Sequence, residues 1–423
     1  MFTKISKIIN IFSIYLIRAS LRLKSDSLTC FILLINLKKM KKIKTHINRK
    51  KIIVLSKSGG IDDLNSAYSS IANNDIAFYE LPRNLIKEIF IYFIKDSEYR
   101  DYYTLDYDDK IKLRKKEYKN FLHKVFKKLD YFWKFDACIS FNLFYFAEND
   151  LPEPFQRLNK KFFVLHKESV NSLEESIINL KTYSSMNKKF NGNKIAVYCE
   201  NEKNILIESK ILNKNQIEIT GCARTDYCYQ LRDITPNQNE LVYFMIENNR
   251  SVTEIKSSGR LVDWSDLIIK TNSYLKELAL KNKNLKIIFK GKKNVHTVKD
   301  IPKDLPDNCF FSNTNPGHKF LKNANIVMAF NSTILFEAIL ANRNVLIPLF
   351  DVNKNNIEKL IYKSPNIFLE NKDIFFSKID ELLNKRYSNR DMSKEEKECI
   401  NFYLGNIDGK SGYRLRQFIT NNL

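Results

Sequence analysis

The sequence contains few of the residues that metal, disulfide and redox-cofactor sites require. Its 423 residues include only five histidines and seven cysteines, and no two cysteines have the Cys-x-x-Cys spacing of a zinc or dithiol site. An odd, dispersed set of cysteines is typical of reduced thiols in a cytoplasmic protein. No Gly-x-Gly-x-x-Gly motif is present, so binding of NAD or FAD is not indicated. We therefore expect no metal, no cofactor and a cytoplasmic location.

Two short motifs lack the surroundings that their chemistry needs. Asp106-Tyr107-Asp108 matches an Mn²⁺-binding D-x-D motif, but it follows a polar stretch instead of an apolar strand. We interpret it as a solvated loop or a helix start. Gly409-Lys410-Ser411 resembles the end of a P-loop. The preceding glycine is one residue too close and no strand comes before it, so we reject that reading.

No apolar run reaches the ~20 residues that a membrane-spanning helix needs. Residues 1–51 carry 13 Lys and Arg residues and one acid, which accounts for +12 of the net charge of +22. Arg18 and Arg22 stand where a signal peptide would have small residues. We interpret this tail either as a peripheral attachment to an anionic membrane surface, at the inner face of the cell membrane, or as a disordered or mis-called extension before Met40. No nucleic-acid-binding motif is present, and we expect no nucleic-acid partner.

The length suits two domains of ordinary size plus extensions. Apolar runs of strand length recur on both sides of a polar segment, residues 233–239, which contains Pro236. The sequence predicts an α/β fold with two Rossmann-like domains. The expected segments are an extension (1–50), a first domain (51–235), a second domain (236–400) and a last helix (401–423).

The clearest local pattern lies between residues 325 and 351. Residues 326–330 form an apolar run with the β-branched content of a buried strand, and the helix-capping residues 331–333 follow. Apolar residues then recur at helical spacing over 335–340, and a second apolar run spans 345–349. The pattern predicts a βαβ unit whose helix begins at the carboxyl edge of a parallel sheet.

The start of that helix is a candidate nucleotide site. Unpaired N–H groups and the helix dipole suit a phosphate near Asn331, Ser332 and Thr333. Glu337 is four residues beyond Thr333, hence on the same helix face and roughly 6 Å further along the axis. Its carboxylate could accept hydrogen bonds from a ribose diol. The alternative is that the three polar residues only cap the helix and that Glu337 is solvated.

Polar residues also follow the predicted strands of the first domain. Gly59 and Gly60 follow the first strand, where they either let a ligand approach the backbone or only make a turn. Asn142 and His166 follow two later strands and should lie at the cleft edge of a doubly wound sheet. A neutral His166 could accept a proton from an attacking hydroxyl, with Glu168 orienting the ring or acting as the base itself. A structural role for His166 is the alternative.

Asn331-Ser332-Thr333, Glu337-Ala338 and Pro348 resemble the donor-site signature of GT-B glycosyltransferases. The related families are surface-carbohydrate biosynthesis proteins, CDP-glycerol glycerophosphotransferases and UDP-GlcNAc 2-epimerases. The resemblance implies that the helix N-terminus binds the donor diphosphate and that Glu337 binds the nucleotide ribose. The chain departs from the pattern at residues 341–343, where these families usually have a glycine-containing turn.

Other segments share the resemblance. Residues 221–226 are similar to a G-x-P-R-x-D motif, with alanine in place of proline. In that motif Arg224 would bridge a donor phosphate, and its alternative role is to pair with Asp226. Lys290 would neutralise phosphate charge, although the histidine of the related K-x-H motif is replaced here by Lys292. The sequence of residues 164–169 also resembles the surface-carbohydrate proteins. So does the sequence of the tail around Arg414.

The resemblance implies a GT-B architecture, with two domains facing a cleft and a last helix that packs back on the first. The expected reaction is metal-independent transfer of a sugar from a nucleotide-sugar donor to a cell-surface polysaccharide or glycolipid precursor. The substrate would be a nucleotide sugar or a CDP-polyol, and the acceptor a glycan or a lipid-linked glycan. A polyol-phosphate transferase, a UDP-GlcNAc 2-epimerase-like enzyme and a non-enzymatic basic membrane-binding protein remain alternatives. The five histidines make the epimerase harder to support.

Overall fold

The structure is a computed structural model. It describes residues 2–41, 43, 50–71, 74–95, 109–167, 170–171, 173–186, 188–246, 256–257, 260–261, 264–292, 296–297, 300–330, 332–351, 368–405 and 407–423. The chain divides into two compact units. The first unit comprises Met1–Ser169, Ser176–Arg224 and Lys410–Leu423, and the second comprises Val170–Glu175 and Thr225–Gly409.

The first unit is built on a seven-stranded sheet with the order β1-β3-β2-β4-β5-β6-β7. Neighbouring strands are parallel, except that β1 pairs antiparallel with β3 at one edge. The parallel strands are short apolar runs, as expected where both faces of a sheet are covered. Their bounds are β1 (Lys38–Lys39), β2 (Lys50–Ser56), β3 (Ile76–Pro82), β4 (Ala137–Ser140), β5 (Lys161–Leu165), β6 (Lys194–Val197) and β7 (Ile217–Ile219).

Each face of this sheet has its own apolar core. In β2, Ile53 and Leu55 enter one core while Ile52 and Val54 enter the other, because successive side chains of a strand point to opposite faces. The helices between the strands are α3 (Gly60–Tyr68), α4 (Arg83–Phe93), α6 (Asp109–Phe132), α7 (Phe146–Asn149), α8 (Pro152–Gln156), α9 (Leu173–Ser185) and α10 (Glu200–Glu208).

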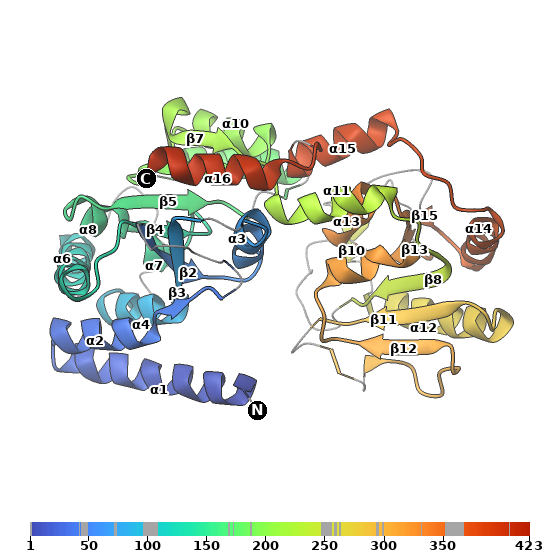
Figure 1. The fold of residues 1–423 in the computed structure, drawn as a ribbon, viewed down its shortest axis with the longest axis horizontal. Helices are drawn as coiled ribbons and strands as arrows, with labels where there is room; N and C mark the ends of the chain where they lie inside the picture. Colours follow the sequence, from blue (N-terminus) through green and yellow to red (C-terminus); the bar gives the residue numbers. More distant parts are fainter. Residues whose placement is uncertain are drawn as a thin grey trace. The chain divides into compact units, whose positions relative to one another are not determined.

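The last helix, α16 (Ser411–Asn422), belongs to the first unit and packs on α3 (Figure 1). Its residues Leu415, Phe418 and Ile419 are buried in the same core as Ile52 and Val54. The apolar positions at spacings of three and four residues form the helix face that makes this contact. The predicted return of the last helix to the N-terminal domain is therefore confirmed.

The N-terminal segment forms a helical hairpin of α1 (Phe2–Arg22) and α2 (Asp26–Asn36). Ser25 caps α2, accepting a hydrogen bond from the Leu28 N–H. Apolar side chains of the hairpin, such as Ile17 and Leu33, lie in the core beneath the sheet. α1 packs on α4 and α2 packs on α6. In place of the disordered extension that the sequence allowed, the described part of this segment is integrated into the first unit.

The second unit contains a six-stranded, fully parallel sheet with the order β12-β11-β8-β13-β14-β15. A separate two-stranded sheet pairs β9 (Lys256–Ser257) with β10 (Arg260–Leu261). The parallel strands are β8 (Asn237–Phe244), β11 (Lys286–Lys290), β12 (Cys309–Ser312), β13 (Ala324–Met328), β14 (Asn344–Pro348) and β15 (Phe368–Leu369). The longer helices are α12 (Trp264–Lys281), α14 (Lys372–Asn384) and α15 (Lys394–Leu404).

The helix predicted after residues 331–333 is α13 (Ile334–Leu340). The strand before it, β13, begins and ends two residues earlier than the predicted run of 326–330. The chain enters the second unit at Thr225, ahead of the predicted linker at 233–239. The reason is that α11 (Asp226–Gln230) packs on α13, while β8 begins inside the predicted linker.

A mostly parallel sheet in the first unit and a fully parallel sheet in the second, each with covering helices, define an α/β fold with two Rossmann-like domains. Among the residues that the structure describes, no helix is both long enough and apolar enough to cross a membrane.

Candidate functional site

Three neighbouring strands bring the predicted donor residues to one edge of the second sheet. β11 and β13 both pair in parallel with β8, so the carboxyl ends of all three strands lie at the same edge. Lys290 is the last residue of β11, while Ser332 and Thr333 come shortly after β13. The ends of β11 and β13 are two strand spacings apart, roughly 10 Å. This separation suits a ligand with the length of a nucleotide diphosphate.

The hydroxyl of Thr333 does not cap α13. Thr333 occupies the N-cap position in a helical conformation, and its side chain makes no capping hydrogen bond. The turn is closed by the backbone instead, because the Leu335 N–H donates to the Ser332 carbonyl at 3.0 Å. The simple capping role is therefore not the role of Thr333. Asn331 lies outside the described residues, and its part in the site stays a prediction.

Glu337 is the exception in a helix that is otherwise buried on every side. The other six residues of α13 are buried, and Glu337 alone is partly exposed. A helix with apolar residues all round belongs in a protein core, so a carboxylate in its middle needs a specific reason. The Cys228 thiol of α11 lies 4.0 Å from Glu337 Oε2. The placement fits the predicted contact with a ribose, which remains a prediction.

Lys290 supplies positive charge at the same edge. Its side chain is buried, its ammonium donates to the Gly291 carbonyl, and it lies 5.6 Å from the ring centre of Phe320. Burial lowers the pKa of Lys290 from its ordinary value. An arriving phosphate would replace part of the lost hydration and favour the charged form.

The structure adds residues to this region that the sequence analysis did not select. Gly317 begins η5 (Gly317–Lys322), and a Cβ on it would lie 3.3 Å from Ile334 Cδ1, at the start of α13. The next residue, His318, stacks edge-on with Tyr227 at 5.4 Å between ring centres. The Pro-Gly-His string after an apolar strand is the sequence signal that would have identified them.

His296 is a second histidine near this edge that no sequence motif indicated. The related K-x-H motif has its histidine at the position of Lys292, and here His296 folds back on that turn. Its Nδ1 accepts from the Lys292 N–H at 3.0 Å, so Nε2 carries the proton and donates to the Ile246 carbonyl at 3.0 Å. Both ring nitrogens are thus used to shape the loop after β11.

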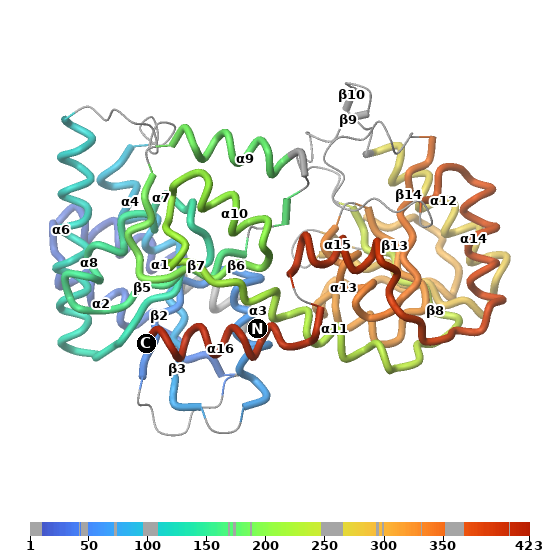
Figure 2. The backbone as a smooth tube through the Cα atoms, turned by 90° about the horizontal axis from the view of Figure 1, so that it is seen from above, coloured from blue at the N-terminus to red at the C-terminus, as the bar shows by residue number. Residues whose placement is uncertain are grey.

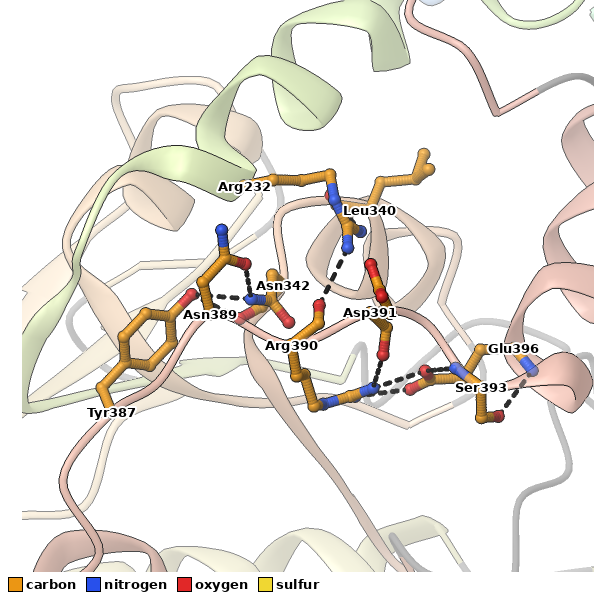
Figure 3. Close-up of polar contacts among 9 residues, drawn as sticks. All are labelled: Arg232, Leu340, Asn342, Tyr387, Asn389, Arg390, Asp391, Ser393 and Glu396. Carbon is orange, nitrogen blue, oxygen red and sulfur yellow. Dashed lines mark hydrogen bonds and ion pairs between the residues drawn. The ribbon is translucent and has the colours of Figure 1, made fainter.

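The departure at residues 341–343 is accommodated by an asparagine and a buried arginine. Asn342 has φ of 58°, a left-handed conformation that glycine and asparagine adopt most readily at the end of a helix. Its side-chain amide donates to Tyr387 Oη at 3.1 Å and to Asn389 Oδ1 at 2.6 Å, as Figure 3 shows. In the same view, Arg232 donates to the carbonyls of Leu340 and Arg390. These bonds fix the end of α13 to the segment that precedes α15.

In the first unit, Gly59 and Gly60 each have a structural reason to be glycine. Gly59 has φ of +80°, and its N–H donates to the Asp62 carboxylate at 3.2 Å. A Cβ on Gly60 would overlap the ring of Phe141. A Cβ on Gly59 would lie 3.5 Å from the Lys167 side chain, so a basic group is close to this turn. Approach of a ligand to these glycines stays a prediction.

Arg224 is held in a buried network at the carboxyl edge of the first sheet. Its guanidinium donates to Asp63 at 3.1 Å and to Tyr198 Oη at 2.9 Å, and its backbone N–H donates to Asp63 at 3.0 Å. Tyr198 also donates to Asp63 at 2.6 Å, and burial raises the pKa of Tyr198. The structure thus shows Asp63 as the carboxylate partner of Arg224, where the sequence suggested Asp226. Its phosphate contact stays a prediction.

His166 is buried, and both of its ring nitrogens face protein groups. Nδ1 accepts from the Leu143 N–H at 3.2 Å, so the proton is on Nε2, which lies 3.3 Å from Glu202 Oε1. This geometry favours the structural alternative, in which His166 positions the loop after β4. In that loop, Asn142 Oδ1 accepts from the Phe144 N–H at 2.7 Å and forms a local turn. Glu168 lies outside the described residues.

The D-x-D match, Asp106-Tyr107-Asp108, lies outside the described residues, and Asp109 next to it begins α6. Within the described ranges, no three His, Cys, Asp or Glu side chains are arranged to hold a metal ion.

No family model and no curated protein sequence matches the chain. Solved structures similar to it include the UDP-GlcNAc 2-epimerase of Methanocaldococcus jannaschii in complex with UDP-GlcNAc and UDP. That protein is 14% identical over 88% of this chain and 99% of its own length, with a TM-score of 0.44. The UDP-GlcNAc 2-epimerase of Neisseria meningitidis is 12% identical over 88% and 100%, with a TM-score of 0.45. A glycosyltransferase of Rickettsia africae is 13% identical over 89% and 100%, with a TM-score of 0.45.

Proposed function

We propose that the protein is a glycosyltransferase that moves a sugar from a nucleotide-sugar donor to a cell-surface polysaccharide or glycolipid precursor. The donor binds at the carboxyl edge of the second sheet. The observation that carries this proposal is the position of Glu337, the only partly exposed side chain of a buried helix, one turn beyond Ser332 and Thr333. The same residues match the donor-site signature found in the sequence.

Each group at this edge has a separate task. The hydroxyls of Ser332 and Thr333 and the N–H groups of the first turn of α13 bind phosphate oxygens. α13 has only seven residues, so its dipole is short and the formal charge comes from Lys290. Glu337 accepts hydrogen bonds from the ribose hydroxyls, roughly 6 Å along the helix from Thr333. The scheme uses no metal ion: Lys290 and the N–H groups stabilise the charge that develops on the departing diphosphate.

In the transfer step, an acceptor hydroxyl forms a bond to the anomeric carbon while the bond from that carbon to the diphosphate breaks. The hydroxyl proton passes to a base, and the nucleoside diphosphate leaves with the bonding electrons. Because the ring of His166 faces Leu143 and Glu202, we assign the base to Glu168 and a positioning role to His166. The acceptor binds in the first unit, near Gly59, Gly60 and Lys167.

Nucleotide binding provides the first test. We expect UDP, CDP or GDP to raise the melting temperature of the wild-type chain, since a ligand that binds only the folded state stabilises it by about 2.7 kcal/mol at 100 times its Kd. Glu337→Gln should weaken binding of the nucleoside and the nucleotide alike, by about tenfold, because a hydrogen bond to a charged group is worth about 1.5–3 kcal/mol. Lys290→Met should weaken only the diphosphate.

The matched control is Glu381→Gln, which changes an exposed carboxylate of α14 that pairs with Lys378. It should bind nucleotides like the wild type. If Glu337→Gln and Glu381→Gln bind every nucleotide equally well, the donor site is elsewhere or absent. Turnover assays then separate the reactions. Release of UDP from nucleotide sugars supports a glycosyltransferase, whereas turnover of CDP-glycerol alone identifies a polyol-phosphate transferase.

A further inference from the structure

A cavity outside the candidate donor and acceptor regions lies in the first unit, among α1, α4 and α6. Its volume is about 560 Å³, which is within the range of sites for small molecules. It is bounded by the last turn of α1 and the following turn, the end of α4, and one face of α6. These helices lie together at one end of the unit (Figure 1, Figure 2). Nothing in the transfer reaction uses this cavity.

The cavity has two chemical characters. Four cations line it against one acid, Glu117; they are Lys24, Lys95, Arg114 and Lys124. The rest of the lining is mainly aromatic: Tyr92, Phe93 and Phe121, with Leu21 and Asn120 beside them. The rings of Phe93 and Phe121 are centred 5.5 Å apart. A ligand that satisfies both parts carries a negative charge and an apolar portion.

The cavity helices and the neighbouring α2 carry many exposed apolar side chains. Among the described residues, ten of the nineteen large apolar side chains that are exposed lie on α1, the turn after it, α2, α4 and α6. On α2, Phe31 and Ile35 are 57% and 54% exposed and share one face, because they are four residues apart. On α1, Phe12 and Tyr15 are each 62% exposed. Exposed apolar side chains gathered on neighbouring elements mark an interaction surface.

We propose that this surface docks on a membrane and that the cavity binds the phosphate headgroup of an anionic phospholipid. The cations of the cavity bind the phosphate headgroup, and its aromatic lining contacts the apolar part of the same lipid. The exposed apolar side chains of α1 and α2 enter the boundary between headgroups and acyl chains. A free phosphate would use the cations and leave the apolar side chains without a role. A second copy of the chain would bring like charges together. An anionic lipid surface uses both features.

Vesicle flotation of the full chain tests the proposal. We expect binding to phosphatidylcholine vesicles that contain ~30% phosphatidylglycerol, weak binding to pure phosphatidylcholine, and a loss of binding as salt increases. Lys124→Gln should lower partitioning roughly five-fold. Its matched control is Lys127→Gln, an exposed lysine of the same helix that does not line the cavity. Equal losses for both variants would show a diffuse basic surface and overturn the cavity assignment.

Phe31→Ser tests the apolar part, with Phe310→Ser, an exposed phenylalanine of the second unit, as control. Only Phe31→Ser should reduce flotation, and its melting temperature should stay near that of the wild type. Complete inhibition of flotation by millimolar glycerol phosphate would identify a soluble phosphate as the ligand and overturn the proposal. So would concentration-dependent dimerisation without flotation, or flotation abolished by RNA. The assay contains no nucleotide, so its outcome is independent of the proposed transferase activity.

Discussion

At the scale of single residues, Arg343 shows how a departure from a sequence pattern is accommodated. Its fully buried guanidinium donates to the carbonyls of Leu321 at 2.7 Å, Ile234 at 3.1 Å and Leu231 at 3.2 Å, and to Tyr387 Oη at 3.1 Å. Burial lowers the pKa of Arg343, but its acceptors satisfy the charge. The sequence revealed that glycine was missing at this turn. The partners of Arg343 could not be predicted because they come from three distant segments.

Lys188 is a buried cation whose titration should be visible in the stability of the protein. Its ammonium donates to Asn149, lies 5.5 Å from the ring centre of Phe144, and has Asp150 and Lys115 nearby. Burial lowers the pKa of Lys188 to about 7. The unfolded chain therefore binds more protons than the folded chain between about pH 7 and 10.5, and stability rises with pH across that window.

We expect Lys188→Met to be more stable than the wild type at pH 6, where the buried charge is present in full. The advantage should shrink between pH 7 and 10, by up to about 1.4 kcal/mol per pH unit. Urea denaturation at several pH values measures it. Lys189→Met, which changes the exposed neighbour, should show no such pH dependence relative to the wild type. A constant difference across this range would show that Lys188 keeps its proton in the folded state.

At the scale of elements, patterns in the sequence located most of the sheet and α13 but not the precise ends. Buried parallel strands are continuous apolar runs, so they can be found without knowledge of their neighbours. The apolar run predicts an end of β13 that is two residues too late, because residues 329 and 330 are also apolar and buried. The sequence does not predict how the α1–α2 hairpin packs, because α1 packs on α4 and α2 packs on α6, which lie far along the chain. Likewise, Asp63 could not be assigned to Arg224 from sequence, since 161 residues separate them.

The contact of α16 with the first unit should contribute strongly to stability. Phe418 is 1% exposed and packs edge-on against Phe163 at 5.9 Å between ring centres. Phe418→Ala should lower the free energy of unfolding by about 3–5 kcal/mol, the usual cost of removing a buried phenylalanine. Tyr413→Ala, at an exposed position of the same helix, should cost less than about 1 kcal/mol. Similar midpoints for both variants in denaturant would show that α16 is not part of the cooperative fold.

At the scale of the whole molecule, the strand pattern predicted the architecture and a short motif predicted the donor residues. The two-domain α/β architecture followed from chain length and the repeated strand pattern. The donor residues followed from a short signature, and the structure brings Ser332, Thr333 and Lys290 to one sheet edge. The position of the basic cavity could not be predicted from the net charge. The sequence placed the excess charge in residues 1–51, whereas three of the four lining cations come from after β3. Surface clusters depend on which helix faces meet, and a composition count does not contain that.

The two proposed ligands bind different units, so hydrogen exchange of the whole chain should distinguish their two binding sites. UDP, or whichever nucleotide raises the melting temperature, should slow exchange at the N–H groups of the first turn of α13 and in the loop after Lys290. Anionic vesicles should instead protect the last turn of α1 and the adjoining part of α6. Glu337→Gln should remove the first pattern and keep the second, and Lys124→Gln should do the reverse. If the nucleotide protects α6 but not α13, its site lies in the first unit and the donor assignment to the second sheet is wrong.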